Sequence, residues 1–126
     1  MEEWNNSSSI RCRGAKVFSV SLRHCAEKNP IQILVDAICN VAPREETTRL
    51  TYGGVATHVA VDISPLRRVD LALRYLTLAI HQRSFSNVKS IEEVTAEELI
   101  LAANNDPSSA AVKKKLEVER IALSAR

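Results

Sequence analysis

The spacing of the apolar residues switches from a helical period to strict alternation and back again along this chain, and this switch most limits the folds that the chain can adopt. Between residues 47 and 63, apolar and polar side chains alternate, which is typical of a half-buried strand. The apolar members of the alternation are Val59, Val61 and Ile63. Leu50 and Tyr52 fall on one face of a preceding strand, and Gly53-Gly54 lies at the bend, where a positive φ is cheap for glycine. Residues 47–63 are therefore predicted to form a β-hairpin between helical segments.

A helix is predicted on each side of this hairpin. Pro30 suits the first turn of the earlier helix, Asn29 suits its cap, and Pro43 ends it. Its apolar stripe is predicted to be Ile31, Leu34, Val35 and Ile38. Ser64-Pro65 begins the later helix with a cap followed by proline. The predicted buried face of that helix comprises Leu66, Val69, Leu73, Leu76 and Ile80.

Two further helices are predicted after these two, and a helix with a weaker sequence signal is predicted before them. Ser90 and Glu93 form a capping box that predicts a helix over 90–104, and Ser108 is predicted to cap a last helix that ends near Ser124. The segment 16–27 has weaker helical spacing, and the polar residues 1–10 are expected to be mobile. The fold class is thus mainly α: a helical bundle-like domain of about five helices with an inserted, protruding β-hairpin. We expect one domain over residues 11–126.

Composition excludes several kinds of protein. The three cysteines lack C-x-x-C spacing and the three histidines are scattered, so we expect free thiols in a reducing compartment, no metal site and no cofactor. No apolar run is long enough to span a membrane, and the N-terminus lacks a secretory signal, so a cytosolic protein is expected. Catalytic motifs such as G-x-S-x-G, H-E-x-x-H and phosphate-binding glycine loops are missing, so we expect no enzyme and no catalytic residue.

The charge is unevenly distributed although its sum is only +2. Residues 11–28 hold five basic side chains and one acidic one, and residues 113–126 hold five basic and two acidic. Residues 92–106 hold five acidic side chains and no basic one: Glu92, Glu93, Glu97, Glu98 and Asp106. An acidic face of this kind would turn away from nucleic acid, toward solvent or a protein neighbour.

The helix after Ser64 carries the first candidate binding surface. Arg67, Leu71, Arg74, Leu78 and His81 lie along one side of it. Arg67 and Arg74 are about 10 Å apart along the axis, a spacing that suits two backbone phosphates. The Arg68 side chain is predicted to point to the flank of this surface. A merely solvated helix face remains the alternative explanation.

The hairpin is the second candidate surface. Arg49, Tyr52 and His58 lie near the glycine bend, where an aromatic ring is available for base stacking and basic groups for phosphate. An ordinary hairpin with a tight turn is the alternative.

The run Lys113-Lys114-Lys115 is the third candidate. Three consecutive residues fan across about 200° of a helix, and they lie in a first turn, where the helix dipole disfavours positive charge. Bound phosphate would relieve that conflict. A solubilising run with a Lys113–Glu117 pair is the alternative.

Short motifs in a fixed order connect these features to a known family. They are Asn29-Pro30-Ile31-Gln32-Ile33-Leu34-Val35, Ala42-Pro43-Arg44-Glu45, Tyr52-Gly53-Gly54, Val61-Asp62-Ile63-Ser64-Pro65-Leu66-Arg67-Arg68-Val69, Ala111-Val112-Lys113-Lys114-Lys115 and Glu119-Arg120-Ile121-Ala122. Together they closely resemble the small-subunit ribosomal protein seven family in its archaeal and eukaryotic branch, where the eukaryotic member is called ribosomal protein five. The resemblance covers residues 29–126 and implies a helical domain with a protruding hairpin.

The resemblance also implies a function and partners. Members bind the 3′ major domain of small-subunit rRNA, help the head of the subunit to assemble beside other head proteins, and place the hairpin near exit-site tRNA and the mRNA path. By analogy the rRNA contacts would be Arg11, Arg13, Lys16, Arg44, Arg49, Arg67, Arg68, Arg74, Lys113, Lys114 and Lys115. The tRNA-side and mRNA-side hairpin would comprise Tyr52, Gly53, Gly54 and His58.

The N-terminal residues depart from the family pattern. Ser7-Ser8-Ser9 replaces a Gly-Lys-rich signature, so we expect a chain that is N-terminally short and has weaker affinity for naked rRNA than typical members. Two alternatives to a ribosomal constituent stay open: an RNA-binding regulator that acts off the ribosome, and a helical protein-interaction module whose acidic helix is the working surface.

Overall fold

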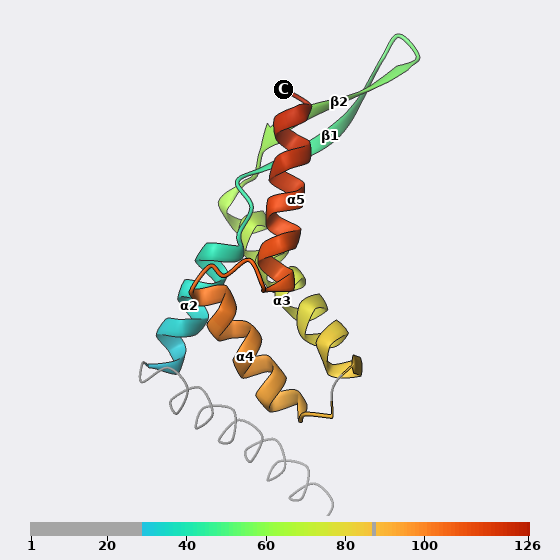
Figure 1. Cartoon of the computed structure of the whole chain (residues 1–126). Helices are drawn as coiled ribbons and strands as arrows, with labels where there is room; N and C mark the ends of the chain where they lie inside the picture. The colour runs from blue at the N-terminus through green and yellow to red at the C-terminus, as the bar shows by residue number, and fades with distance from the viewer. Residues whose placement is uncertain (1–28, 87) are drawn as a thin grey trace, which may run out of the picture.

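The computed structural model describes residues 29–86 and 88–126 of the chain. The elements follow one another as helix α2 (Pro30–Val41), strands β1 (Glu45–Tyr52) and β2 (Val55–Asp62), and helices α3 (Pro65–Ser86), α4 (Ile91–Ala103) and α5 (Ala110–Ser124). The prediction of a mainly helical domain with an inserted hairpin is confirmed: within the described residues, helices form the body and the hairpin projects from it (Figure 1). The weak helix predicted over 16–27 and the polar residues 1–10 lie outside these ranges.

Helix starts follow the local capping chemistry. The Asn29 side chain accepts a hydrogen bond from the Ile31 N–H at 3.1 Å, with Pro30 next in the first turn. The Ser90 hydroxyl accepts from the Glu93 N–H at 3.4 Å, which confirms that cap. These side chains satisfy backbone donors that the helix itself leaves without a partner.

The start of α5 differs from the prediction by one residue. Ser109, not Ser108, caps this helix, and its hydroxyl accepts from the Val112 N–H. The Ser108 N–H instead donates to the Asp106 carboxylate at 2.9 Å in a tight turn. That turn lowers the pKa of Asp106, because the hydrogen bonds from Ser108 favour the charged carboxylate.

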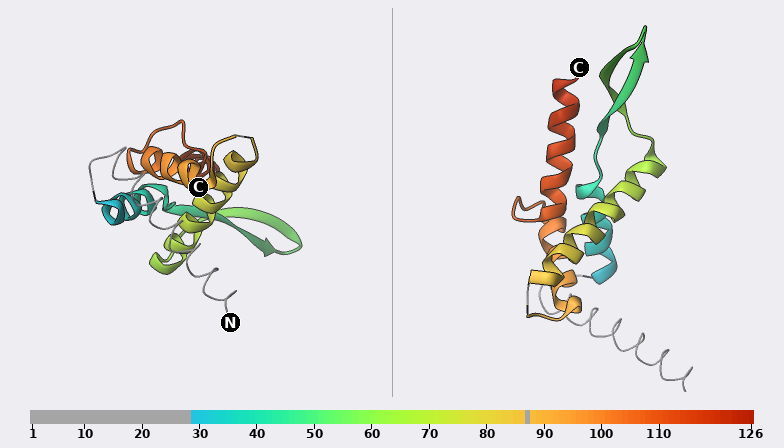
Figure 2. Two further views of the ribbon diagram at one scale, coloured as in Figure 1. Left: turned by 90° about the horizontal axis from the view of Figure 1, so that it is seen from below. Right: turned by 90° about the vertical axis from the view of Figure 1, so that its right-hand side faces the viewer.

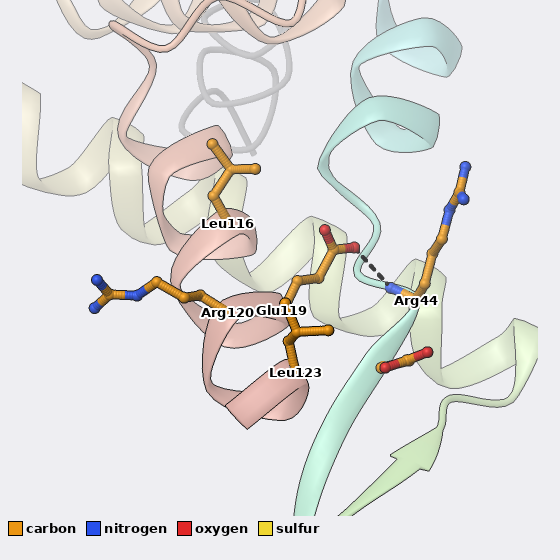
Figure 3. Close-up of a pocket in the computed structure, with 6 residues that line it drawn as sticks. Arg44, Leu116, Glu119, Arg120 and Leu123 are labelled. Atoms are coloured by element: carbon orange, nitrogen blue, oxygen red, sulfur yellow. Dashed lines mark hydrogen bonds between the residues drawn. The ribbon is translucent and has the colours of Figure 1, made fainter. Parts of the chain in front are cut away.

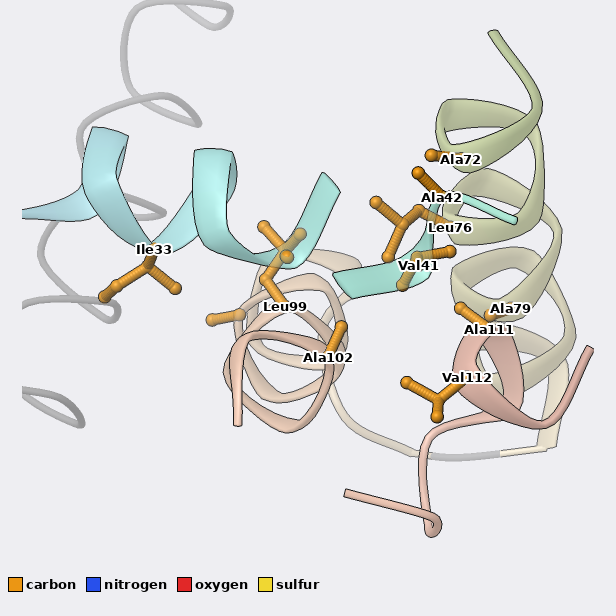
Figure 4. Packing of buried hydrophobic residues seen from close by; sticks show 12 residues of the cluster. Ile33, Val41, Ala42, Ala72, Leu76, Ala79, Leu99, Ala102, Ala111 and Val112 are labelled. Carbon is orange, nitrogen blue, oxygen red and sulfur yellow. The ribbon is translucent and has the colours of Figure 1, made fainter. Parts of the chain in front are cut away.

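The core lies where all of the described helices meet, and small residues dominate it (Figure 4). Alanines of α2, α3, α4 and α5 are almost completely buried there beside a few larger aliphatic side chains. The cluster comprises Ile33, Ala37, Val41, Ala42, Ala72, Leu76, Ala79, Ala96, Leu99, Ala102, Ala111 and Val112. Small side chains let helix backbones approach closely, so this chain buries a compact interior with very few aromatic groups.

The apolar stripe predicted for α2 was wrong. The residues that α2 buries are Ile33, Ala37 and Val41, whereas Ile31 is 70% exposed. Leu34 and Val35 are also exposed, and Ile38 is only partly buried against the core. Counting bulky apolar residues selected the neighbouring side of the helix, because Ala37 contributes more to close packing than its size suggests.

The same error affects α3. Leu76 is buried as predicted, but Leu66, Val69 and Leu73 are exposed. The face that meets the core has Ala72 and Ala79 beside Leu76. This face keeps the 4-3 spacing of a helix stripe, with alanine at two of its three positions.

The hairpin confirms the predicted period and turn. Strands β1 and β2 pair antiparallel from Glu45↔Asp62 at the base to Tyr52↔Val55 at the tip. Gly53 and Gly54 have φ values of +57° and +85°, as a two-residue turn with both central residues left-handed requires. The ribbon extends beyond the helices, at the end of the molecule where α5 finishes (Figures 1 and 2).

We expect Gly54→Val to loosen the ribbon without weakening the body. A side chain in the left-handed region costs about 1–2 kcal/mol, so hydrogen exchange at the ribbon amides should accelerate by roughly tenfold. The melting temperature should not change, because the tip buries nothing in the core. A melting temperature lowered by several degrees would contradict this independence of ribbon and body.

Candidate nucleic-acid interface

The ribbon is the most exposed element among the described residues. All residues from Thr48 to Val59 are exposed, and Tyr52 near the tip is 90% exposed. A two-stranded hairpin alone is marginally stable in water and gains most when something packs against it. A ribbon held out from the body in this way is suited to contacts with another molecule.

The register divides the ribbon into two chemically different faces. Residues directly opposite each other share a face, and alternate pairs change face. The apolar face carries Leu50, Tyr52, Val55, Val59 and Val61, with Glu46, Thr48 and Thr57. The polar face carries Thr47, Arg49, Thr51, Ala56, His58 and Ala60, with Glu45 and Asp62 at the base. Leu50 and Tyr52 share a face as predicted, but Tyr52 is separated from Arg49 and His58, which the sequence had grouped into one site.

Arg49 and His58 form the centre of the polar face. They are directly opposite each other in the register, and both are exposed. Within residues 29–86 and 88–126, Arg49 has no acidic partner. This pair therefore offers a guanidinium and an imidazole to an external anion.

Arg67 joins α3 to the base of the ribbon, and Arg68 joins it to the segment between α2 and β1. The Arg67 guanidinium donates to both carboxylate oxygens of Glu46, at 2.8 and 3.2 Å. The hydrogen bond with Glu46 and the charge of that carboxylate raise the pKa of Arg67. Arg68 donates from Nε to the Pro43 carbonyl at 3.1 Å. To bind phosphate, either guanidinium would have to give up or share a contact that it already makes.

The row of residues predicted along α3 does not form one exposed surface. Leu71 is buried within it, and Leu78 is exposed. Arg74 is exposed, and its Nη2 lies 3.8 Å from Asp70 Oδ2, a loose pair that leaves most of the guanidinium accessible. The His81 ring packs on Phe85, with their centroids 4.8 Å apart.

The three lysines of α5 point to different surroundings, as their spacing predicted. Lys113 is exposed and makes no ion pair in the part of the chain that the structure describes. Lys114, rather than Lys113, pairs with Glu117 at 2.8 Å, which raises the pKa of Lys114 and lowers that of Glu117. Lys115 donates to the Asn40 carbonyl at 2.8 Å and so joins α5 to α2.

The acidic stretch is not a single exposed face. Glu98 is 0% exposed and lies among α3, α4 and α5. Its carboxylate accepts hydrogen bonds from Arg83 at 2.8 Å, from the Ser109 hydroxyl at 2.6 Å and from the Ala111 N–H at 3.4 Å. Glu97 pairs with Lys89 at the surface. Sequence reasoning missed the internal role of Glu98, although its helical spacing from Val94 and Ala102 places it on the buried side of α4.

The remaining predicted site residues are not part of the ribbon faces, α3 or the lysine run. Arg11, Arg13 and Lys16 fall outside the described residues. Arg44 is exposed at the start of β1, on the side that faces α5. Within the described ranges, histidine, cysteine and acidic side chains do not gather in threes as a metal would require, and none of the helices combines the length and hydropathy of a membrane span.

Comparison with known proteins identifies this helical body and projecting ribbon. A family model described as ribosomal protein S7p/S5e matches residues 15–126. The chain therefore belongs to the S7p/S5e family of ribosomal proteins, and the resemblance drawn from its motifs is confirmed.

Two archaeal proteins are similar to this chain in sequence. The small ribosomal subunit protein uS7 of Cenarchaeum symbiosum is 54% identical over 99 residues, which cover 79% of this chain and 50% of that protein. The protein of the same name from Methanothermobacter thermautotrophicus is 58% identical over 99 residues, covering 79% of this chain and 53% of that protein. The chain thus spans about half the length of the curated relatives it matches.

Proposed function

We propose that this chain is a structural, non-catalytic component of the small ribosomal subunit in the cytoplasm. The single observation that carries the proposal is membership of the S7p/S5e family over residues 15–126. The exposed ribbon, whose polar face carries Arg49 and His58 away from the base, supports a role in RNA binding. Its partners would be small-subunit rRNA and neighbouring ribosomal proteins.

The finer proposal is that the chain binds the 3′ major domain of the rRNA and supports assembly of the subunit head. Arg49, Arg74 and Lys113 are the strongest candidates for phosphate contacts, because their charged groups are exposed and make at most a loose pair with described residues. Arg67, Arg68, Lys114 and Lys115 would first serve the fold, since each already contacts a partner. The ribbon tip at Tyr52, Gly53 and Gly54, with His58, would approach exit-site tRNA and mRNA.

Sedimentation of the tagged chain in cell lysate on sucrose gradients tests the proposal. We expect migration with small subunits that persists in high salt, because an integral component is held by shape complementarity as well as by phosphate contacts, and salt weakens only the phosphate contacts. Migration at the top of the gradient at every salt concentration would contradict it.

Two outcomes would identify other functions. Association with an mRNA but not with small subunits would indicate an off-ribosome regulator. RNA binding with a flat salt dependence would indicate a protein-interaction module, because phosphate contacts give a steep negative slope.

A further inference from the structure

A groove runs between the second half of α5 and the start of β1, away from the ribbon tip (Figure 3). It has a volume of about 370 Å³, is open to solvent, and is lined by Arg44, Glu45, Leu116, Glu119, Arg120 and Leu123. The α5 residues of this lining have the spacing i, i+3, i+4, i+7, so they form one continuous stripe on that helix. Arg44, immediately before β1, and Glu45, the first residue of β1, form the opposite wall.

The middle of the groove is apolar and open. Leu116 and Leu123 are 52% and 63% exposed, although α5 buries Ala111, Val112 and Ala122 on its core side. The two leucines are seven residues apart, so they recur after two turns, about 10 Å along the axis. Apolar side chains with this recurrence are the anchors that a second helix packs against when it lies along the first.

The acidic side chains of the groove have partners within the described part of the chain, whereas its basic side chains make no ion pair there. Glu119 accepts a hydrogen bond from the Arg44 backbone N–H at 3.1 Å, and Glu45 pairs with Arg126, so both carboxylates already hold the walls together. The guanidinium groups of Arg44 and Arg120 make no ion pair with any residue that the structure describes. In Figure 3 these two guanidinium groups point away from each other, on opposite sides of the leucines. An incoming ligand therefore meets an apolar centre with a cation on each side.

We propose that this groove docks an amphipathic helix of a neighbouring protein, with an apolar stripe flanked by carboxylates. Such a helix buries both leucines and gives each guanidinium a hydrogen-bonded anionic partner. RNA suits the groove less well. Its backbone has no aliphatic side chains to cover Leu116 and Leu123, and its phosphates would lie beside Glu45 and Glu119. The family resemblance implies an rRNA contact for Arg44, whereas we assign this residue to a protein partner.

The test uses the full chain and two fluorescent probes of equal negative charge in anisotropy titrations. One probe is a helical peptide with two leucines seven residues apart and glutamates on both flanks, and the other is oligouridylate. We expect saturable peptide binding that weakens about tenfold or more in Leu116→Ser/Leu123→Ser, because two apolar contacts are lost. Leu66→Ser, which alters an exposed leucine on α3, is the matched control and should bind normally.

Charge reversal gives an independent readout. Arg44→Glu/Arg120→Glu should lose the acidic peptide and gain a peptide in which lysines replace the glutamates. The proposal is overturned if the leucine variant binds the acidic peptide as well as the unaltered chain does, or if no saturable binding occurs below on the order of 1 mM. Oligouridylate that binds more tightly than the peptide, and that is lost in the arginine variant, would make the groove a nucleic-acid site instead. Circular dichroism confirms that each variant is folded.

Discussion

Glu98→Ala is expected to destabilise the body more than any other substitution of a charged residue in the described part of the chain. The substitution removes the acceptor of the Ser109 hydroxyl and the Ala111 N–H, and both donors are buried at the start of α5. It also removes the carboxylate that Arg83 contacts from α3. Deleting one partner of a buried ion pair costs about 3–5 kcal/mol, and since Arg83 is one-third exposed we expect about 3 kcal/mol here.

A thermal melt followed by circular dichroism measures this effect. A loss of about 3 kcal/mol lowers the melting temperature of a domain of this size by more than about 10 °C. Glu97→Ala is the matched control, because the neighbouring carboxylate forms only an exposed pair with Lys89 and should change stability by about 1 kcal/mol or less. Glu98→Gln should fall between the two, since its amide oxygen still accepts a hydrogen bond. Equal melting temperatures for Glu97→Ala and Glu98→Ala would refute a stabilising role for the buried carboxylate.

The features that the sequence predicted correctly depend on residues close together in the chain. The caps at Asn29 and Ser90 each involve a donor two or three positions away. The turn at Gly53-Gly54 depends on the left-handed φ that glycine adopts readily. Alternation along the ribbon was visible because every second side chain shares a face. Features of this kind can be predicted from a short stretch of sequence, because every residue that determines them lies within it.

The features that the sequence could not predict depend on distant residues. The partner of Arg67 is Glu46, which lies 21 positions away, and the contact exists only because α3 starts beside the ribbon base. The choice of Lys114 over Lys113 as the partner of Glu117 depends on side-chain direction rather than on helical spacing alone. The buried faces of α2 and α3 were misjudged because alanine, with a weak hydrophobic signal, lines the closest helix contacts.

Shortening the ribbon is expected to reduce RNA affinity sharply and to leave the body intact. In the shortened variant, Thr47 and Ala60 are joined through Gly-Gly, which retains the Glu46↔Val61 pair and hence the anchor of Arg67. The deleted residues are all exposed, so the melting temperature should hardly change. An RNA fragment of the 3′ major domain should bind about tenfold to a hundredfold more weakly, because one stacked base is worth about 1–3 kcal/mol and a phosphate contact is lost as well.

Single substitutions on the two faces of the ribbon separate stacking from charge. Arg49→Ala on the polar face should reduce the slope of log affinity against log salt by about one, whereas Tyr52→Ala on the apolar face should weaken binding without changing that slope. Lys89→Ala removes the same charge from the loop before α4 and should leave the slope unchanged, since Lys89 pairs with Glu97 away from the ribbon. If the shortened chain keeps its full affinity, the RNA surface must lie on the helices, where Arg74 and Lys113 are the exposed basic residues to test next.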